Sequence, residues 1–214
     1  MEGIINETNL KYLISLRPKL DPVLTRMQKF AKKNDIPIIS VEVGKFLELI
    51  TLIKDPDKVL EVGMAIGFSG IFIARALKMR GKLTTIEKSL PNINLARSNF
   101  TEAGIVNKVE IIPGDATKVL PELEGPFDMA FLDAQKEEYK DYLKYTIELM
   151  NPGGVIIVDN LLWHGQTAGG PAISEKYAAA TKALVKFNKH FINHPDLIST
   201  ILPVGDGIGF AIVK

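Results

Sequence analysis

The chain has no cysteine among its 214 residues, and this absence excludes several kinds of chemistry. Disulfide frameworks, thiolate metal sites and cysteine nucleophiles all require that residue. A chain without cysteine suits a reducing compartment, so we expect a cytoplasmic location.

A large net charge and long apolar runs are also missing. The 26 basic and 25 acidic residues leave a formal net charge of +1, so the whole chain has no general attraction to nucleic acid or anionic membranes. A local basic patch remains possible. No apolar run reaches the roughly 18 residues that a membrane span needs. Residues 1–10 contain Glu2, Asn6 and Glu7 and do not resemble a secretory signal. We therefore expect no membrane partner.

Short β-branched runs alternate with helical patterns from Lys58 onward, which predicts a parallel sheet covered by helices on both faces. The expected strands are 58–62, 82–87, 109–113, 127–132 and 154–158, and the expected helices are 69–78, 89–103, 116–120 and 137–150. Pro152-Gly153-Gly154 is interpreted as the turn between the last helix and the last strand of this series.

The pattern changes after residue 158. A glycine-containing loop over 165–171 precedes an expected helix over 173–191. Strands 199–204 and 209–213 follow, joined by Gly205-Asp206-Gly207, and an Asp-Gly pair between strands favours a hairpin. The predicted fold class is therefore α/β, with a mostly parallel seven-stranded sheet and an antiparallel C-terminal hairpin. We expect one domain over 1–214, with a helical layer (1–53) on an α/β core (54–214). A separate N-terminal domain is the alternative.

The segment "VLEVGMAIGFSG" (59–70) joins the first strand to a helix through a glycine turn. Its G-x-x-x-G spacing differs from the G-x-G-x-x-G of dinucleotide-binding turns. Glu61, beside the turn, would repel a pyrophosphate but would suit a cationic ligand. Glu87 ends the second strand, where an acid can bind ribose hydroxyls. Asp115 can accept a hydrogen bond from an adenine amine, and Ala116 offers a backbone N–H. Together these residues favour S-adenosylmethionine, although each alone is more often a turn or cap residue.

Oxygen-bearing side chains also follow the fourth and fifth strands. Asp133, Asp159 and Asn160 offer three oxygen ligands, a set that favours Mg²⁺, with Mn²⁺ or Ca²⁺ as alternatives. Three protein ligands leave coordination positions open for substrate. In the alternative interpretation, Asp159-Asn160 only caps a turn.

With these residues placed, the chain resembles the cation-dependent O-methyltransferases, which include catechol O-methyltransferase and the plant caffeoyl-CoA O-methyltransferases. The resemblance covers nearly the whole chain and lies in "VLEVGMAIGFSG", "LTTIEKS", "IIPGDA", "FDMAFLDAQKEEY", "NPGGVIIVDNLLWHG" and "NHPDLISTILPVGDGIGFAIVK". It implies a Rossmann-like S-adenosylmethionine-dependent methyltransferase fold and a homodimer. It also implies the metal ligands Asp133, Asp159 and Asn160, with Lys136 as general base. The implied cofactor contacts are Val41, Glu61, Gly63, Ser69, Glu87, Asp115, Ala116 and Asp133.

The acceptor is less well defined by the sequence. The favoured activity is metal-dependent O-methylation of catechol-like or hydroxylated aromatic small molecules. "DIPIIS" and "NHPD…ILPVGDG" resemble a bacterial subgroup that methylates 5-hydroxyuridine in tRNA, so a tRNA acceptor is the alternative. A non-catalytic nucleoside- or RNA-binding module is a third possibility. Gln135 and Ala134 depart from the plant "LDADK" and from the histidine of the catechol enzymes, so plant-type acceptor specificity is not carried over.

Several residues near the expected acceptor have two interpretations. Trp163 either lines the acceptor pocket or packs in the core, and His164 is interpreted as a loop residue rather than a ligand. The glycines at 165, 169 and 170 predict a mobile flap over the site. Arg17, Lys19 and Arg26 either face an acidic acceptor such as tRNA or form a solvated face.

Overall fold

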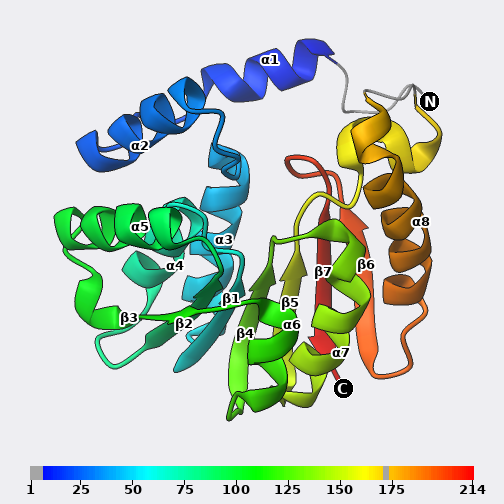
Figure 1. The fold of residues 1–214 in the computed structure, drawn as a ribbon. Coiled ribbons are helices and arrows are strands. Elements are labelled where there is room, and N and C mark those ends of the chain that lie inside the picture. Colours follow the sequence, from blue (N-terminus) through cyan, green and yellow to red (C-terminus); the bar gives the residue numbers. More distant parts are fainter. Residues whose placement is uncertain (1–6, 171–173) are drawn as a thin grey trace.

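A seven-stranded sheet lies between two layers of helices in the computed structural model, which describes residues 7–170 and 174–214 (Figure 1). The strands are β1 (Lys58–Val62), β2 (Lys82–Glu87), β3 (Val109–Pro113), β4 (Phe127–Leu132), β5 (Met150–Val158), β6 (Leu197–Leu202) and β7 (Ile208–Val213). Their order is β3-β2-β1-β4-β5-β7-β6. The first five strands are parallel, and β7 pairs antiparallel with both β5 and β6. The predicted α/β class and the antiparallel hairpin are confirmed.

The α-helices are α1 (Glu7–Ser15), α2 (Pro22–Lys33), α3 (Val41–Lys54), α4 (Phe68–Ala76), α5 (Leu90–Glu102), α6 (Ala116–Val119), α7 (Tyr139–Glu148) and α8 (Ala178–Ile192). Short 3₁₀ segments are η1 (Val106–Lys108), η2 (Leu120–Glu122), η3 (Lys136–Glu138), η4 (Trp163–Ala168) and η5 (Glu175–Tyr177). Side-chain caps fix several helix starts: Asp21 accepts from the N–H groups of Val23 and Leu24, and Ser40 accepts from that of Val43. The predicted helix over 173–191 begins outside the described residues, and within them α8 starts at Ala178.

Some predicted boundaries shift by about two residues, such as the strand expected over 199–204, which is β6 at Leu197–Leu202. One predicted turn is wrong. Strand β5 begins at Met150 and contains Pro152-Gly153-Gly154, which the sequence suggested as a turn. Phe127 pairs with Met150 and Met129 pairs with Val155, so the register shifts between these pairs. Extra residues on one strand form a bulge, which tolerates proline and a glycine of positive φ such as Gly153 (φ 74°). The preceding helix accordingly ends at Glu148.

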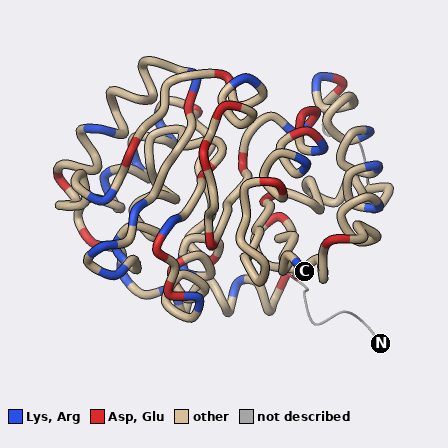
Figure 2. The backbone as a smooth tube through the Cα atoms, turned by 90° about the horizontal axis from the view of Figure 1, so that it is seen from below, with Lys and Arg blue, Asp and Glu red and all other residues tan. Residues whose placement is uncertain are grey.

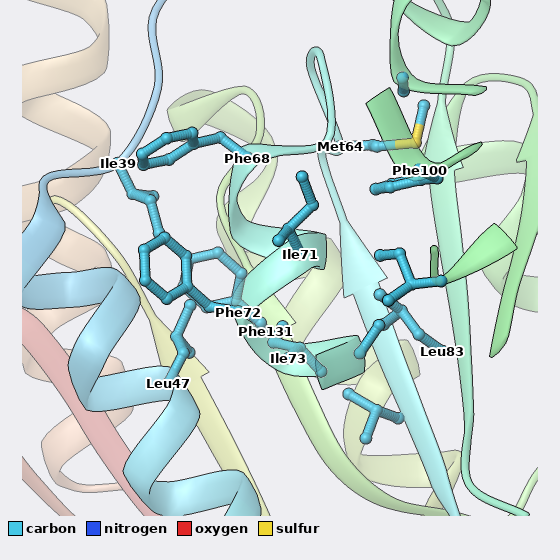
Figure 3. Close-up of a cluster of buried hydrophobic side chains, with 14 of the residues drawn as sticks. Ile39, Leu47, Met64, Phe68, Ile71, Phe72, Ile73, Leu83, Phe100 and Phe131 are labelled. Carbon is cyan, nitrogen blue, oxygen red and sulfur yellow. The ribbon is translucent and has the colours of Figure 1, made fainter. Parts of the chain in front are cut away.

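Alternate residues of the strands face two separate apolar cores. Val59, Leu83 and Phe131 pack with residues of α2 to α5, and Leu60, Ile86 and Leu132 pack with residues of α6 to α8. Figure 3 shows the first core, where Phe72 lies beside Leu47 of α3. Since α2 and α3 share this core with the sheet, the arrangement supports one domain, which stays a prediction.

Charges of both signs are interspersed along the chain, in keeping with its net charge of +1 (Figure 2). Within residues 7–170 and 174–214, no helix is both long enough and apolar enough to cross a lipid bilayer.

Candidate active site

Four backbone hydrogen bonds align the carboxyl ends of the five parallel strands. In each, the residue just beyond a strand donates its N–H to a neighbouring carbonyl at 2.9–3.0 Å: Gly114 to Glu87, Gly63 to Ile86, Asp133 to Val62 and Asp159 to Leu132. The strand order changes direction between β1 and β4, the position where open α/β sheets bind ligands. The fold therefore brings the predicted residues Gly63, Glu87, Asp133 and Asp159 to one edge of the sheet.

Packing within the protein requires the glycines of the β1–α4 turn. Gly63 has φ 95°, and a Cβ atom there would lie 2.1 Å from the carbonyl oxygen of Asp133. Gly67 has φ 85°, and its Cβ would lie 2.6 Å from the Phe100 ring. We predicted that this turn lets the backbone approach a ligand. The structure supplies another reason for both glycines, because a side chain would collide with Asp133 after β4 at Gly63 and with Phe100 of α5 at Gly67.

Glu61 lies beneath that turn and is 0% exposed. Its two carboxylate oxygens accept hydrogen bonds from Ser69 Oγ at 2.5 Å and Thr85 Oγ1 at 2.6 Å. Burial raises the pKa of Glu61 to about 7, against the opposing effect of these two hydrogen bonds. Glu61 and Ser69 therefore brace the turn from inside the fold, and their contact with the cofactor stays a prediction.

Glu87 and Asp115 are held by backbone groups at the ends of β2 and β3. Glu87 accepts from Ala65 N at 2.9 Å and from Ser89 N at 2.8 Å. Asp115 caps α6, and its Oδ1 accepts from the side chain and the N–H of Thr117, which lower the pKa of Asp115. Each carboxylate oxygen can accept more than one hydrogen bond, so both groups keep capacity for a polar ligand.

Two further predicted cofactor residues are buried at helix starts. Val41 begins α3 and is 5% exposed, and Ala116 begins α6 and is 8% exposed. Their contacts with a cofactor also stay predictions.

Lys136 lies at the centre of a buried polar group. Its Nζ donates to Asp133 Oδ1 at 2.7 Å and to the Tyr139 hydroxyl at 2.7 Å. The Tyr139 hydroxyl donates in turn to the carbonyl oxygen of Asp159 at 3.1 Å. Burial raises the pKa of Tyr139 well above its usual value, so the phenol keeps its proton. The amine thus contacts Asp133, just after β4, and is linked through the Tyr139 hydroxyl to Asp159, just after β5.

Asp159 and Asn160 follow β5. Asp159 is 3% exposed, and its Oδ1 accepts from Asn160 N at 2.6 Å. Burial, together with the nearby Asp133 carboxylate, raises the pKa of Asp159 to about 7. Asn160 has φ 63°, a left-handed conformation that asparagine tolerates. No described residue hydrogen-bonds to its side-chain amide.

These residues fit a divalent cation by their chemistry. The repulsion between the Asp133 and Asp159 carboxylates is what a bound cation would relieve, and all the donors are oxygens. Among the described residues, no group of three or more His, Asp or Glu side chains is arranged to hold a metal ion. The predicted set has two carboxylates and an amide, so its role as ligands stays a prediction.

The aromatic ring of Trp163 lies beside Lys136 and packs against a second ring. The Trp163 ring packs at 89° against Tyr177, with ring centroids 5.5 Å apart, and its centroid lies 5.9 Å from Lys136 Nζ. The buried Trp163 Nε1 has no hydrogen-bond partner among the described residues. His164 is largely exposed, and its ring lies tilted beside that of Trp163 with centroids 5.7 Å apart. Trp163 thus contacts both the apolar core and the polar group.

Sequence reasoning missed Tyr139, Thr85 and Tyr177. The three-residue spacing of Lys136 and Tyr139 was the available signal, since such residues meet on one helical face. Thr85 and Tyr177 reach their partners Glu61 and Trp163 through tertiary packing, for which local sequence gives no signal.

Known proteins resemble the whole chain. Residues 15–214 match the O-methyltransferase family. A catechol O-methyltransferase of Niastella koreensis is 32% identical over 225 residues, covering 100% of both chains. A catechol O-methyltransferase of Mycobacterium tuberculosis is 35% identical over 91% of this chain and 90% of that one. An O-methyltransferase of Streptomyces achromogenes, solved in complex with S-adenosylmethionine, has a TM-score of 0.83 and 30% identity, covering 95% of each chain. The chain therefore belongs to the O-methyltransferase family, with the methyltransferase fold that its sequence predicts.

Proposed function

We propose that this S-adenosylmethionine-dependent O-methyltransferase methylates catechol-like or hydroxylated aromatic small molecules with the help of a divalent cation. One observation carries the proposal: the ends of β4 and β5 bring Asp133, Asp159 and Lys136 together in a largely buried group. Two relatives are named catechol O-methyltransferases, which supports the acceptor class.

Asp133, Asp159 and Asn160 would hold the cation. A phenol has a pKa of about 10, so little of it is ionised at neutral pH. When bound, the cation supplies positive charge that lowers the pKa of an acceptor hydroxyl. Mg²⁺ suits this oxygen set, and Mn²⁺ or Ca²⁺ are the alternatives.

Lys136 would take the hydroxyl proton, and its contacts with Asp133 and Tyr139 fix the position of Nζ. The acceptor oxygen then attacks the methyl carbon of the sulfonium. A C–O bond forms, the C–S bond breaks, and its electron pair stays on sulfur to give S-adenosylhomocysteine. Much of the rate would come from holding the two reactants in line.

Trp163 and Tyr177 would line the acceptor side. Their edge-to-face contact fixes the Trp163 ring beside Lys136, and an aromatic acceptor would pack against that ring. Glu87 and Asp115, on the other side of the turn, would bind the ribose and the adenine of the cofactor.

The test is a methyl-transfer assay with labelled S-adenosylmethionine and a set of catechols. We expect product with Mg²⁺, no product after EDTA treatment, and recovery when Mg²⁺ is restored. The metal mechanism is contradicted if the EDTA-treated wild type and the Asp159→Ala variant both keep full activity. A protein that binds neither S-adenosylmethionine nor a cation would instead fit the non-catalytic binding module.

A second candidate acceptor is tRNA, and a basic groove favours it. The groove, of about 460 Å³, is lined by Lys136, Glu137, Lys140, Ala179, Lys182, Ala183, Lys186, Phe187 and His190. Lys140, Lys182 and Lys186 form no ion pair with any other residue that the structure describes. Burial lowers the pKa of His190 most, followed by the charges of His194 and then Lys140. Unpaired cations beside the candidate base suit a phosphate backbone. Arg17 and Arg26, by contrast, are paired with Glu42 and Glu102.

The two acceptors can be separated by reversing charge in the groove. If tRNA is the acceptor, Lys182→Glu/Lys186→Glu weakens tRNA binding, and the wild-type affinity falls steeply with salt. The control is Lys32→Glu/Lys33→Glu on the exposed end of α2. If the acceptor is a small phenol, both double variants methylate catechols at the wild-type rate and tRNA binding is absent or unaffected.

We also propose a homodimer, as the family resemblance implies. Helix α1 buries no residue, and Leu10, Tyr12, Leu13 and Leu16 are each 48–63% exposed. Leu10, Tyr12 and Leu13 lie on α1 and Leu16 directly follows it. Exposed apolar side chains gathered in this way suit a protein–protein contact. Light scattering on the purified protein would measure the mass, and a monomer at micromolar concentration would contradict the proposal.

A further inference from the structure

The turn between β6 and β7 contacts the loop that follows Asp159 and Asn160. The sequence predicts Gly205-Asp206-Gly207 only as a hairpin connection, and in the structure the turn also includes Val204. In the structure, Leu161 N donates to Gly207 O at 2.9 Å and Leu162 N donates to Asp206 O at 2.9 Å. The Asp206 side chain adds a third bond, since its Oδ1 accepts from His164 N at 2.6 Å.

The loop that donates these three hydrogen bonds has an unfavourable backbone conformation. Asn160, Trp163 and His164 have φ values of 63°, 48° and 54°, although none of them is glycine. Such residues cost of order 1–3 kcal/mol each and persist only where surrounding structure holds them. Trp163 is the outlier among the three, because asparagine and histidine adopt this region more readily than a bulky side chain does. The hydrogen bonds to the turn hold this loop at Leu161, Leu162 and His164. Thr167 and Asn188 hold it from another side, by donating to the Leu161 and Leu162 carbonyls.

Close packing allows the turn little freedom to move. A Cβ atom on Gly207 would lie 2.4 Å from Leu162 Cγ, and one on Gly205 would lie 2.5 Å from Val43 Cγ2. One side of the turn thus contacts the loop with Asn160 and Trp163. The other side contacts α3, which begins at the predicted cofactor residue Val41.

We propose that Asp206 is a positioning residue, whose side-chain oxygen clamps the loop 160–164. The clamp keeps the Trp163 ring beside Lys136 and fixes the backbone at Asn160. The role of Asp206 depends on the place of an acceptor oxygen and not on negative charge. A test of this role by cation binding rests on the proposed function, whereas a test by the fluorescence of Trp163 does not.

Variants at residue 206 separate geometry from charge. Asp206→Asn keeps an oxygen at the Oδ1 position without the charge, and Asp206→Glu keeps the charge but moves the oxygen by one methylene. Asp206→Ala removes both. Asp196→Ala, at the start of β6 and largely exposed, is the matched control for loss of an aspartate. His164→Ala keeps the backbone N–H and controls for the imidazole.

Trp163 is the only tryptophan in the chain, so its fluorescence reports on the loop directly. We expect Asp206→Ala and Asp206→Glu to increase acrylamide quenching of Trp163, with Asp206→Asn, His164→Ala and Asp196→Ala close to wild type. In a Mn²⁺ titration, we expect the Kd to rise by about 10-fold or more for Asp206→Ala and Asp206→Glu only. This is the usual effect of losing a residue that orients metal ligands. Far-UV circular dichroism verifies folding, and Asp206→Glu tests the clamp if Asp206→Ala does not fold.

Two results would overturn the proposal. One is wild-type quenching in both Asp206→Ala and Asp206→Glu. The other is weak Mn²⁺ binding in Asp206→Asn with normal binding in Asp206→Glu, which would assign the role to charge. If the wild type binds no Mn²⁺, the proposed metal dependence fails, while the quenching series still decides the role of Asp206.

Discussion

Lys136 and Asp133, three residues apart, form an ion pair of 2.7 Å in which the lysine side chain is only 9% exposed. A surface pair of this kind contributes little to stability, but a buried one fixes the position of a charge. The ammonium group also donates to Tyr139, so two partners on different segments hold it beside the end of β5.

Substitution of Lys136 tests whether this amine transfers a proton. We expect Lys136→Met to lower kcat by about 100-fold or more, the usual contribution of a general base. Lys136→Arg should be as inactive, because arginine keeps the positive charge beside Asp133 but does not deprotonate at usable pH. Initial rates at saturating S-adenosylmethionine would measure this. An active arginine variant would show that Lys136 acts only as an ion-pair partner.

Substitution of Glu87 tests the cofactor side of the site. Ala65 N and Ser89 N both donate to this carboxylate, which directs it from the end of β2 toward the turn. Glu87→Ala should raise the Kd for S-adenosylhomocysteine by about 10-fold or more, since a hydrogen bond to a charged group contributes roughly 1.5–3 kcal/mol. Calorimetric titration gives the value. Glu110→Ala on neighbouring β3 is the control, and an equal loss in both variants would mean a general disturbance of the sheet.

Much of this edge of the sheet could be predicted from local sequence, because strand ends carry their own signals. Apolar runs stop at Glu87, Asp133 and Asp159, and parallel pairing then brings these ends together. Glu61 is different. It stands one residue before the end of β1, so strand alternation turns its side chain toward the α4 face, away from the edge. The sequence shows the acid but not the burial, because Ser69 and Thr85 reach it only in the folded chain.

The role of Asp206 lay beyond sequence reasoning for a related reason. An Asp-Gly pair predicts a turn, and the turn is present, but its partner His164 is 42 residues away. Local patterns do not specify which loop a hairpin contacts. The start of β5 was predicted wrongly for the same reason, because the bulge at Pro152-Gly153-Gly154 depends on pairing with β4.

Substitution of Asp159 tests the cation site without an activity assay. A ligand that binds only the folded state stabilises it, by about 2.7 kcal/mol at a concentration 100 times the Kd. We expect saturating Mg²⁺ to raise the Tm of the wild type and of Asp196→Ala, but not that of Asp159→Ala. Thermal unfolding with and without Mg²⁺ would measure the shifts. An equal shift in all three proteins would place the cation elsewhere.

Glu61 predicts a dependence of stability on pH. Burial raises its pKa from 4.5 to about 7, so the folded state holds the proton more tightly than the unfolded state does. The stability that comes from this proton is complete below about pH 4.5 and is lost as pH rises through about 7. Glu61→Gln stays neutral throughout. Its unfolding free energy, relative to wild type, should therefore increase by about 3 kcal/mol between about pH 4.5 and about pH 8.

Urea denaturation of both proteins across that pH range would measure the difference, with Glu110→Gln as a control for an exposed glutamate on the same sheet. The direction is the informative part, because a carboxylate that stabilised the fold in its charged form would make Glu61→Gln relatively less stable as pH rises. A difference that stays constant with pH would mean that Glu61 titrates alike in the folded and unfolded chain. The turn between β1 and α4 would then be braced by an ionised acid, with Ser69 and Thr85 supplying the hydrogen bonds that keep its charge buried.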